Sequence, residues 1–140
     1  MHRLVMSITI LGLAAALLAP SAGAQATVIS AAVRPVTVYI VQRAKFEPPT
    51  WGFDRMVITI PPGTTVTWKS VPGNSDSHTS TSLDDGWSSP LLNPGDTWSF
   101  TFSKAGRYRY HCSLHSWMVG AVNVVAGAPV PPATSAPTPQ

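Results

Sequence analysis

Charged residues make up only 11% of this 140-residue sequence, and only six residues are acidic. So few carboxylates argue against an acidic docking patch. The nine lysines and arginines are scattered and form no basic run, so the chain lacks the pattern of a nucleic-acid-binding surface. We therefore expect no nucleic-acid partner, although the formal net charge is +3.

Long apolar runs are also missing. The longest one, Leu4 to Leu18, is shorter than the roughly 20 residues that a membrane-spanning helix needs. It follows a short basic start and precedes Ala22-Gly23-Ala24, which fits the A-x-A pattern of a cleavage site. These features predict an export signal over residues 1–24 and a periplasmic or secreted mature protein without stable membrane association. An uncleaved membrane anchor is the alternative.

The chain has a single cysteine, Cys112, which excludes an internal disulfide. In an exported protein, an unpaired thiol is a liability unless it is buried, paired between chains or bound to a metal. Cysteine is a common core residue, so an inert buried thiol is the alternative to a ligand. The isolation of Cys112 in a chain with an export signal favours the ligand role.

Helical periodicity is absent after the predicted signal, and short alternating runs take its place. Residues Thr97 to Phe102 alternate so that Trp98, Phe100 and Phe102 share one face, which we expect to line the core. Similar runs, separated by turns rich in proline and glycine, cover residues 36–40, 56–60, 65–68, 107–112 and 119–125. With an edge strand over residues 28–33 and a short segment over residues 79–82, the chain has seven or eight strands, which predict an all-β fold, a Greek-key antiparallel β-sandwich.

Turn signals and composition suggest where the elements begin and end. The turn Pro61-Pro62-Gly63-Thr64 predicts that residues 56–60 and 65–68 are the two strands of a hairpin. From Ala126 onward the chain consists mainly of glycine, alanine, proline, threonine and serine, which cannot build a core. We therefore expect one domain over residues 25–125 and a disordered tail over residues 126–140.

Cys112, His115 and Met118 follow one another at intervals of three residues. Their thiolate, imidazole and thioether groups suit copper, because Cu(I) favours sulfur and Cu(II) favours imidazole. A trigonal site needs a second imidazole, and His78 is the natural candidate. His111 adjoins Cys112, so on a strand its side chain points to the opposite face. We therefore expect one copper ion bound by His78, Cys112, His115 and Met118.

The pattern Tyr-x-Tyr-x-Cys-x-x-His-x-x-Met-x-Gly-x-Val-x-Val, from Tyr108 to Val124, resembles the ligand loop of the small blue copper proteins, the cupredoxins. Its two-residue gaps look like the amicyanin type, whereas plastocyanins usually have a longer gap before the methionine. The resemblance continues upstream through residues 46–48, 62–68, 78–79 and 93–97. It implies a cupredoxin β-sandwich around one type 1 copper site.

Three features depart from the family pattern. Thr79 stands where an asparagine often follows the first histidine, so a backbone amide or the Thr79 hydroxyl would have to hydrogen-bond near the sulfur. Ser116-Trp117 stands where a Pro-Phe pair is common, and Trp117 is either an exposed contact beside His115 or a core residue. Thr50 to Arg55 looks like an insertion, to which the sequence assigns no role.

The resemblance implies a monomeric, single-copper electron carrier that meets an unidentified redox partner protein near His115. A copper carrier or delivery protein is the alternative, but Met-rich patterns are missing, because Met1 and Met6 lie in the predicted signal. An enzyme would need a further copper site, and only three histidines follow the signal, so we expect no enzyme. Zinc is disfavoured because structural zinc sites prefer four cysteine or histidine ligands.

Overall fold

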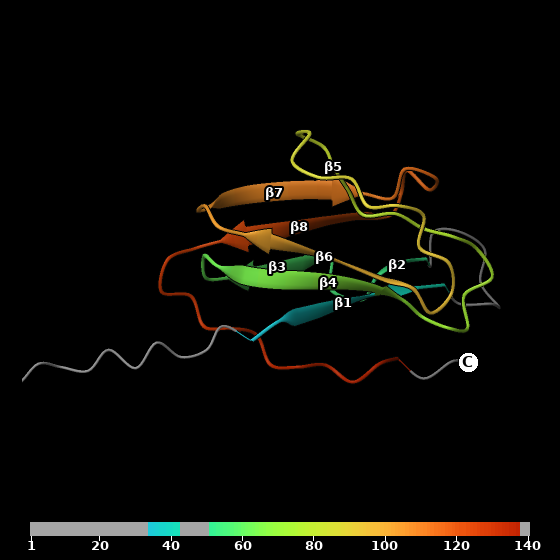
Figure 1. Cartoon of the computed structure of the whole chain (residues 1–140), viewed down its shortest axis with the longest axis horizontal. Coiled ribbons are helices and arrows are strands. Elements are labelled where there is room, and N and C mark those ends of the chain that lie inside the picture. The colour runs from blue at the N-terminus through green and yellow to red at the C-terminus, as the bar shows by residue number, and fades with distance from the viewer. Residues whose placement is uncertain (1–33, 43–50, 138–140) are drawn as a thin grey trace, which may run out of the picture.

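The computed structural model describes residues 34–42 and 51–137, so the predicted export signal and the edge strand expected over residues 28–33 lie outside the described residues. Within these ranges the chain forms strands and loops, and no helix is long and apolar enough to cross a membrane. Eight strands build a two-layered sandwich (Figure 1). Their bounds are β1 Val36–Val41, β2 Gly52–Phe53, β3 Val57–Ile60, β4 Thr64–Ser70, β5 Thr81–Ser82, β6 Thr97–Phe102, β7 Gly106–His111 and β8 Val119–Val124.

Each layer is a four-stranded sheet. The first sheet has the order β2-β1-β4-β6 and the second has the order β3-β8-β7-β5. Two pairs are parallel, β1 with β4 and β3 with β8, and the other pairs are antiparallel. The predicted all-β sandwich of seven or eight strands is confirmed, with the difference that its sheets are mixed. Each parallel pair joins strands that are distant in the sequence, which local alternation does not reveal.

The predicted hairpin between residues 56–60 and 65–68 is wrong. The turn forms at the expected place, with Gly63 at a φ of +85°, but it carries the chain from β3 in one sheet to β4 in the other. The Gly63 amide donates to the carbonyl of Phe102, which belongs to β6. Ile60 and Val66 therefore enter the core from opposite layers. The same turn residues fit a hairpin within one sheet and a crossing between two sheets. The pairing of β3 with β8 favours the crossing.

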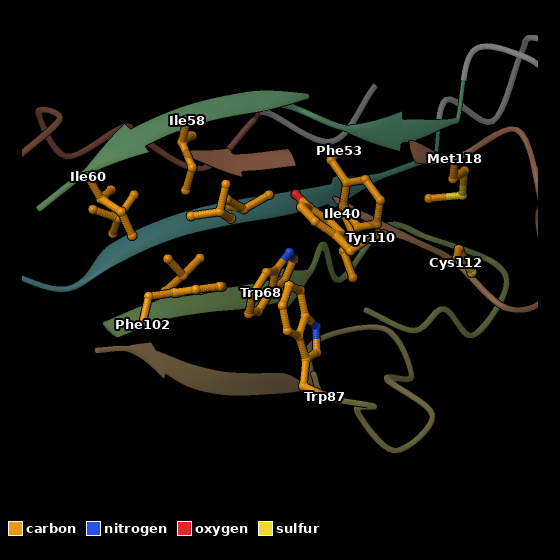
Figure 2. Packing of buried hydrophobic residues seen from close by; sticks show 14 of the residues in the cluster. Ile40, Phe53, Ile58, Ile60, Trp68, Trp87, Phe102, Tyr110, Cys112 and Met118 are labelled. Atoms are coloured by element: carbon orange, nitrogen blue, oxygen red, sulfur yellow. The ribbon is translucent and has the colours of Figure 1, made fainter. Parts of the chain in front are cut away.

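Aromatic side chains dominate the core (Figure 2). Trp68 is fully buried, and its ring centroid lies 5.3 Å from that of Tyr110 and 5.6 Å from that of Trp98. The predicted inner face of β6 is confirmed, because Phe102 is buried and both Trp98 and Phe100 pack against the cluster. Figure 2 shows Cys112 and Met118 together at one end of this cluster, so the core continues into the expected metal site.

Gly120 is required by the packing of Tyr110 on the neighbouring strand. The two residues are direct partners in the register of β7 and β8. A Cβ atom at position 120 would collide with the ring of Tyr110, which is fully buried and lies 4.7 Å from the ring of Phe53. The missing side chain therefore makes room for a core aromatic two residues before Cys112.

The segment from Ala126 to Pro137 contains no regular secondary structure. It turns back after β8 and runs along the side of β1 (Figure 1). Val130 packs against the core, Arg55 Nη2 donates to the carbonyl of Pro132 at 3.0 Å, and the Tyr39 hydroxyl donates to that of Thr134 at 3.4 Å. The disorder expected for residues 126–140 stays a prediction, which these contacts make testable.

Candidate metal centre

The loop between β7 and β8 brings three of the four expected ligands together. Cys112 follows the last residue of β7 and Met118 precedes the first residue of β8. The Cys112 amide donates to the Met118 carbonyl at 3.0 Å, and the Met118 amide donates to the His115 carbonyl at 2.9 Å. Cys112 and Met118 are buried, whereas His115 is partly exposed. The loop is therefore closed at its base by backbone hydrogen bonds.

His78 reaches the same place from the loop that follows β4. It forms an isolated antiparallel bridge with Leu92, in which the His78 amide donates at 3.1 Å and the Leu92 amide donates at 2.8 Å. The next residues are braced as well, because the Ser80 amide donates to Ser89 Oγ and the Trp87 indole donates to Ser80 Oγ. His78 is fully buried, and its position is set by the backbone bridge to Leu92 and by the hydrogen bonds of Ser80.

The donor atoms of these residues converge on one point. The Sγ atom of Cys112 lies 3.5 Å from Nδ1 of His115 and 4.0 Å from Nδ1 of His78, and the three donors lie within 4.8 Å of one another. Bonds of about 2.3 Å to sulfur and about 2.0 Å to nitrogen, as in zinc sites, allow the two donor atoms at most about 4.3 Å. Both distances from the sulfur therefore fit a single metal ion.

Met118 and His111 occupy contrasting positions. Met118 is 1% exposed and belongs to the buried cluster that contains Cys112 (Figure 2). His111 ends β7, pairs with Thr81 and Val119, and lies outside the group formed by the donor atoms. The arrangement thus has the chemistry of one thiolate, two imidazoles and a nearby thioether, a set that suits copper.

Thr79 connects the two ligand-bearing loops. Its backbone amide donates to Sγ of Cys112 at 3.4 Å, and its hydroxyl oxygen accepts a hydrogen bond from the Ser113 amide at 2.8 Å. Thr81 Oγ1 donates to the same hydroxyl at 3.1 Å. The sequence left open whether the amide or the hydroxyl of Thr79 lies near the sulfur. In the structure the amide does, while the hydroxyl positions the residue that follows Cys112.

Burial determines the protonation of His78. Removal from water, with a smaller contribution from the neighbouring His115, lowers the pKa of His78 to about 4. The imidazole is therefore neutral near pH 7, which is the form that binds a metal. In this state Nδ1 can bind a metal without displacing a proton, and Nε2 is buried without a hydrogen-bond partner among the described residues.

Two tryptophans flank His115. The ring centroid of Trp117 lies 5.3 Å from that of His115, and Trp117 is 42% exposed. Of the two positions left open by the sequence, Trp117 therefore occupies the exposed one beside His115. The ring of Trp51 lies 5.1 Å from His115 in an edge-to-face arrangement. Sequence reasoning missed Trp51, and the only signal was its place in the apparent insertion.

Comparison with known proteins explains this combination of fold and donor set. The family described as "Copper binding proteins, plastocyanin/azurin family" matches residues 45–125, more than half of the chain. The chain belongs to this family. It is a cupredoxin, and copper is the cofactor to which its site corresponds. No curated protein sequence is significantly similar to it.

Several solved cupredoxin structures resemble the chain. A purple cupredoxin from Nitrosopumilus maritimus is 32% identical, with a TM-score of 0.57 over 64% of this chain and 99% of that one. An amicyanin variant in its reduced Cu(I) form at pH 4 is 25% identical, with a TM-score of 0.54 over 65% and 82%. A copper-containing nitrite reductase from Thermus scotoductus SA-01 is 29% identical, with a TM-score of 0.55 over 68% and 23%. This chain thus spans about a quarter of the nitrite reductase.

Proposed function

We propose that this cupredoxin is an exported, monomeric electron carrier that holds one type 1 copper ion with His78, Cys112, His115 and Met118. When bound, copper supplies a Cu(I)/Cu(II) couple that accepts and releases single electrons. The observation that carries the proposal is the convergence of the Cys112 thiol with the two Nδ1 atoms at 3.5 and 4.0 Å. Cysteine binds as thiolate, and both histidines bind as neutral imidazoles.

The rigidity of the donor set supports electron transfer. Backbone hydrogen bonds fix Cys112 and Met118 at the base of their loop, and the bridge to Leu92 fixes His78. Cu(I) and Cu(II) prefer different coordination geometries, so a free site would rearrange with every electron. Ligands that cannot move far keep this rearrangement small, and the electron then moves rapidly.

The exposed edge of the site supports exchange with a partner protein at His115. Of the three clustered donor residues, His115 alone is partly exposed. Leu114 and Trp117 beside it are 55% and 42% exposed, so the imidazole lies next to two large apolar side chains at the surface. A redox partner with a complementary apolar surface would bring its own centre close to this imidazole.

Burial also argues against copper delivery, the alternative function. A delivery protein must pass its metal to another molecule, which requires ligands that a recipient can reach. His78, Cys112 and Met118 are at most 1% exposed, so release requires the site to open. An enzyme that reduces nitrite or oxygen would need a further copper site, and the described residues contain a single group of histidine and cysteine donors.

One-electron electrochemistry of the copper-loaded protein separates these functions. We expect a reversible wave for one electron per chain and slow transfer of Cu(I) to a competing chelator, because three ligands are buried. The control is His111→Ala, which leaves both results unchanged because His111 lies outside the donor group. Rapid loss of Cu(I) to the chelator, together with an irreversible wave, would overturn the electron-carrier proposal in favour of copper delivery.

A further inference from the structure

Trp51 is held in place by the strand that follows it. Gly52 and Phe53 form β2, which pairs with the end of β1 through Val41 and Ile40. Phe53 is buried, and Asp54 fixes the register, since its Oδ1 accepts the Tyr39 amide at 2.7 Å and its amide donates to the Tyr39 carbonyl at 2.9 Å. The apparent insertion therefore contains an edge strand, β2, that begins directly after Trp51, beside the metal centre.

The indole of Trp51 contacts both imidazoles of the donor set. Its ring centroid lies 5.1 Å from that of His115 at 83° and 6.4 Å from that of His78 at 90°. Trp117, by contrast, contacts His115 but makes no ring contact with His78 among the described residues. The Trp51 ring is the aromatic group that spans the pair of histidines.

Hydrogen bonds to the described residues do not explain this placement. The Nε1 atom of Trp51 is buried without a partner among the described residues. Burying an indole N–H without an acceptor costs free energy, and a tryptophan at the end of an edge strand could otherwise turn this group towards water. The interactions that the Trp51 ring does make at this position are its contacts with the rings of His78 and His115.

We propose that Trp51 closes the copper site by covering its two imidazole ligands, so that small external ligands cannot reach the metal. This inference rests on the proposed function. A closed site offers no position at which an exogenous molecule can bind the metal. The centre can then exchange electrons only through its ligands. This inference also assigns a role to a residue of the apparent insertion, to which the sequence assigned none.

The test compares copper-loaded Trp51→Ala with the wild type during titration with azide, a small anion that binds accessible Cu(II). The wild-type visible spectrum should not change. Trp51→Ala should show a saturable azide-to-copper band, with apparent affinity at least tenfold higher than any wild-type response. Trp51→Phe should respond little, because a phenyl ring still covers the histidines. The matched control is Trp117→Ala, which removes an aromatic contact with His115 and should stay closed.

A blue Trp51→Ala protein that ignores azide, or a Trp117→Ala protein that responds equally, would overturn the assignment. A wild-type protein without a thiolate–copper band would instead overturn the proposed function. The covering geometry can then be judged in the metal-free protein by NMR, which also serves if Trp51→Ala fails to fold. Nuclear Overhauser contacts from the Trp51 indole to both imidazoles support the geometry, and contacts to neither histidine overturn it.

Discussion

Replacing Gly120 by alanine tests the packing next to the metal centre. A Cβ atom there would collide with the ring of Tyr110, and Tyr110 cannot withdraw because Phe53 and Trp68 contact its other sides. The backbone of Gly120 does not lie at positive φ, so the collision is the only source of strain. Overpacking of a core costs about 1–3 kcal/mol, and we expect about 2–3 kcal/mol here because the obstacle is a fully buried ring.

Urea unfolding of the metal-free protein, followed by circular dichroism, measures this cost. For a domain of this size, about 2–3 kcal/mol corresponds to a loss of roughly 8–24 °C in Tm. Gly52→Ala is the matched control, since a Cβ atom there meets nothing within 4 Å and the glycine is not at positive φ. We expect Gly52→Ala to be neutral or stabilising by up to about 1 kcal/mol, because alanine restricts the unfolded chain.

A double-mutant cycle identifies the cause. Tyr110→Leu removes the ring that Gly120→Ala would strike, so the second substitution should cost less than about 1 kcal/mol in that background. The reasoning is refuted if Gly120→Ala costs the same amount with and without the Tyr110 ring. It is also refuted if Gly120→Ala is as harmless as Gly52→Ala in the wild-type chain.

Three further predictions concern Thr79, the tail and His78. Thr79→Val removes the acceptor of the Ser113 amide and should cost about 0.5–1.5 kcal/mol in urea unfolding, because Ser113 is exposed and its amide can bond to water instead. Thr79→Ser should restore the stability, and equal stability of the two variants would contradict this. Deleting residues 129–140 removes Val130 from the core and should lower the unfolding free energy by about 1–2 kcal/mol, while an unchanged Tm would support a disordered tail. Burial lowers the pKa of His78 to about 4, against 6.5 in the unfolded chain, so unfolding takes up a proton between these values. Metal-free stability should therefore be full above pH 6.5 and fall as the pH drops towards 4, and His78→Gln should flatten this profile.

The spacing of residues in the sequence was sufficient to predict the part of the site that lies in one loop. Cys112, His115 and Met118 are close in the sequence, and a loop of this length between two strands necessarily brings them close in space. His78 was placed by ligand chemistry, since copper needs a second imidazole. Its exact position depends on the bridge to Leu92, which no local sequence pattern predicts.

Contacts between distant segments account for what the sequence did not reveal. The ring of Trp51 reaches His115 because β2 pairs with β1, and a two-residue strand has no recognisable alternation. Likewise, the turn at Gly63 carries signals that fit either a hairpin or a crossing between sheets. The choice depends on β8, some 60 residues further along the chain. Pairing energies of this kind are decided by the whole core and not by the turn.

The central claim is that Cys112 binds copper as a thiolate within the group formed with His78 and His115. The most direct measurement is the visible spectrum of the Cu(II)-loaded protein beside the Cys112→Ser and His111→Ala variants. We predict an intense thiolate-to-copper band in the wild type and in His111→Ala, and its complete loss in Cys112→Ser. A protein that binds one copper ion per chain without this band, or a band that survives Cys112→Ser, would contradict the account.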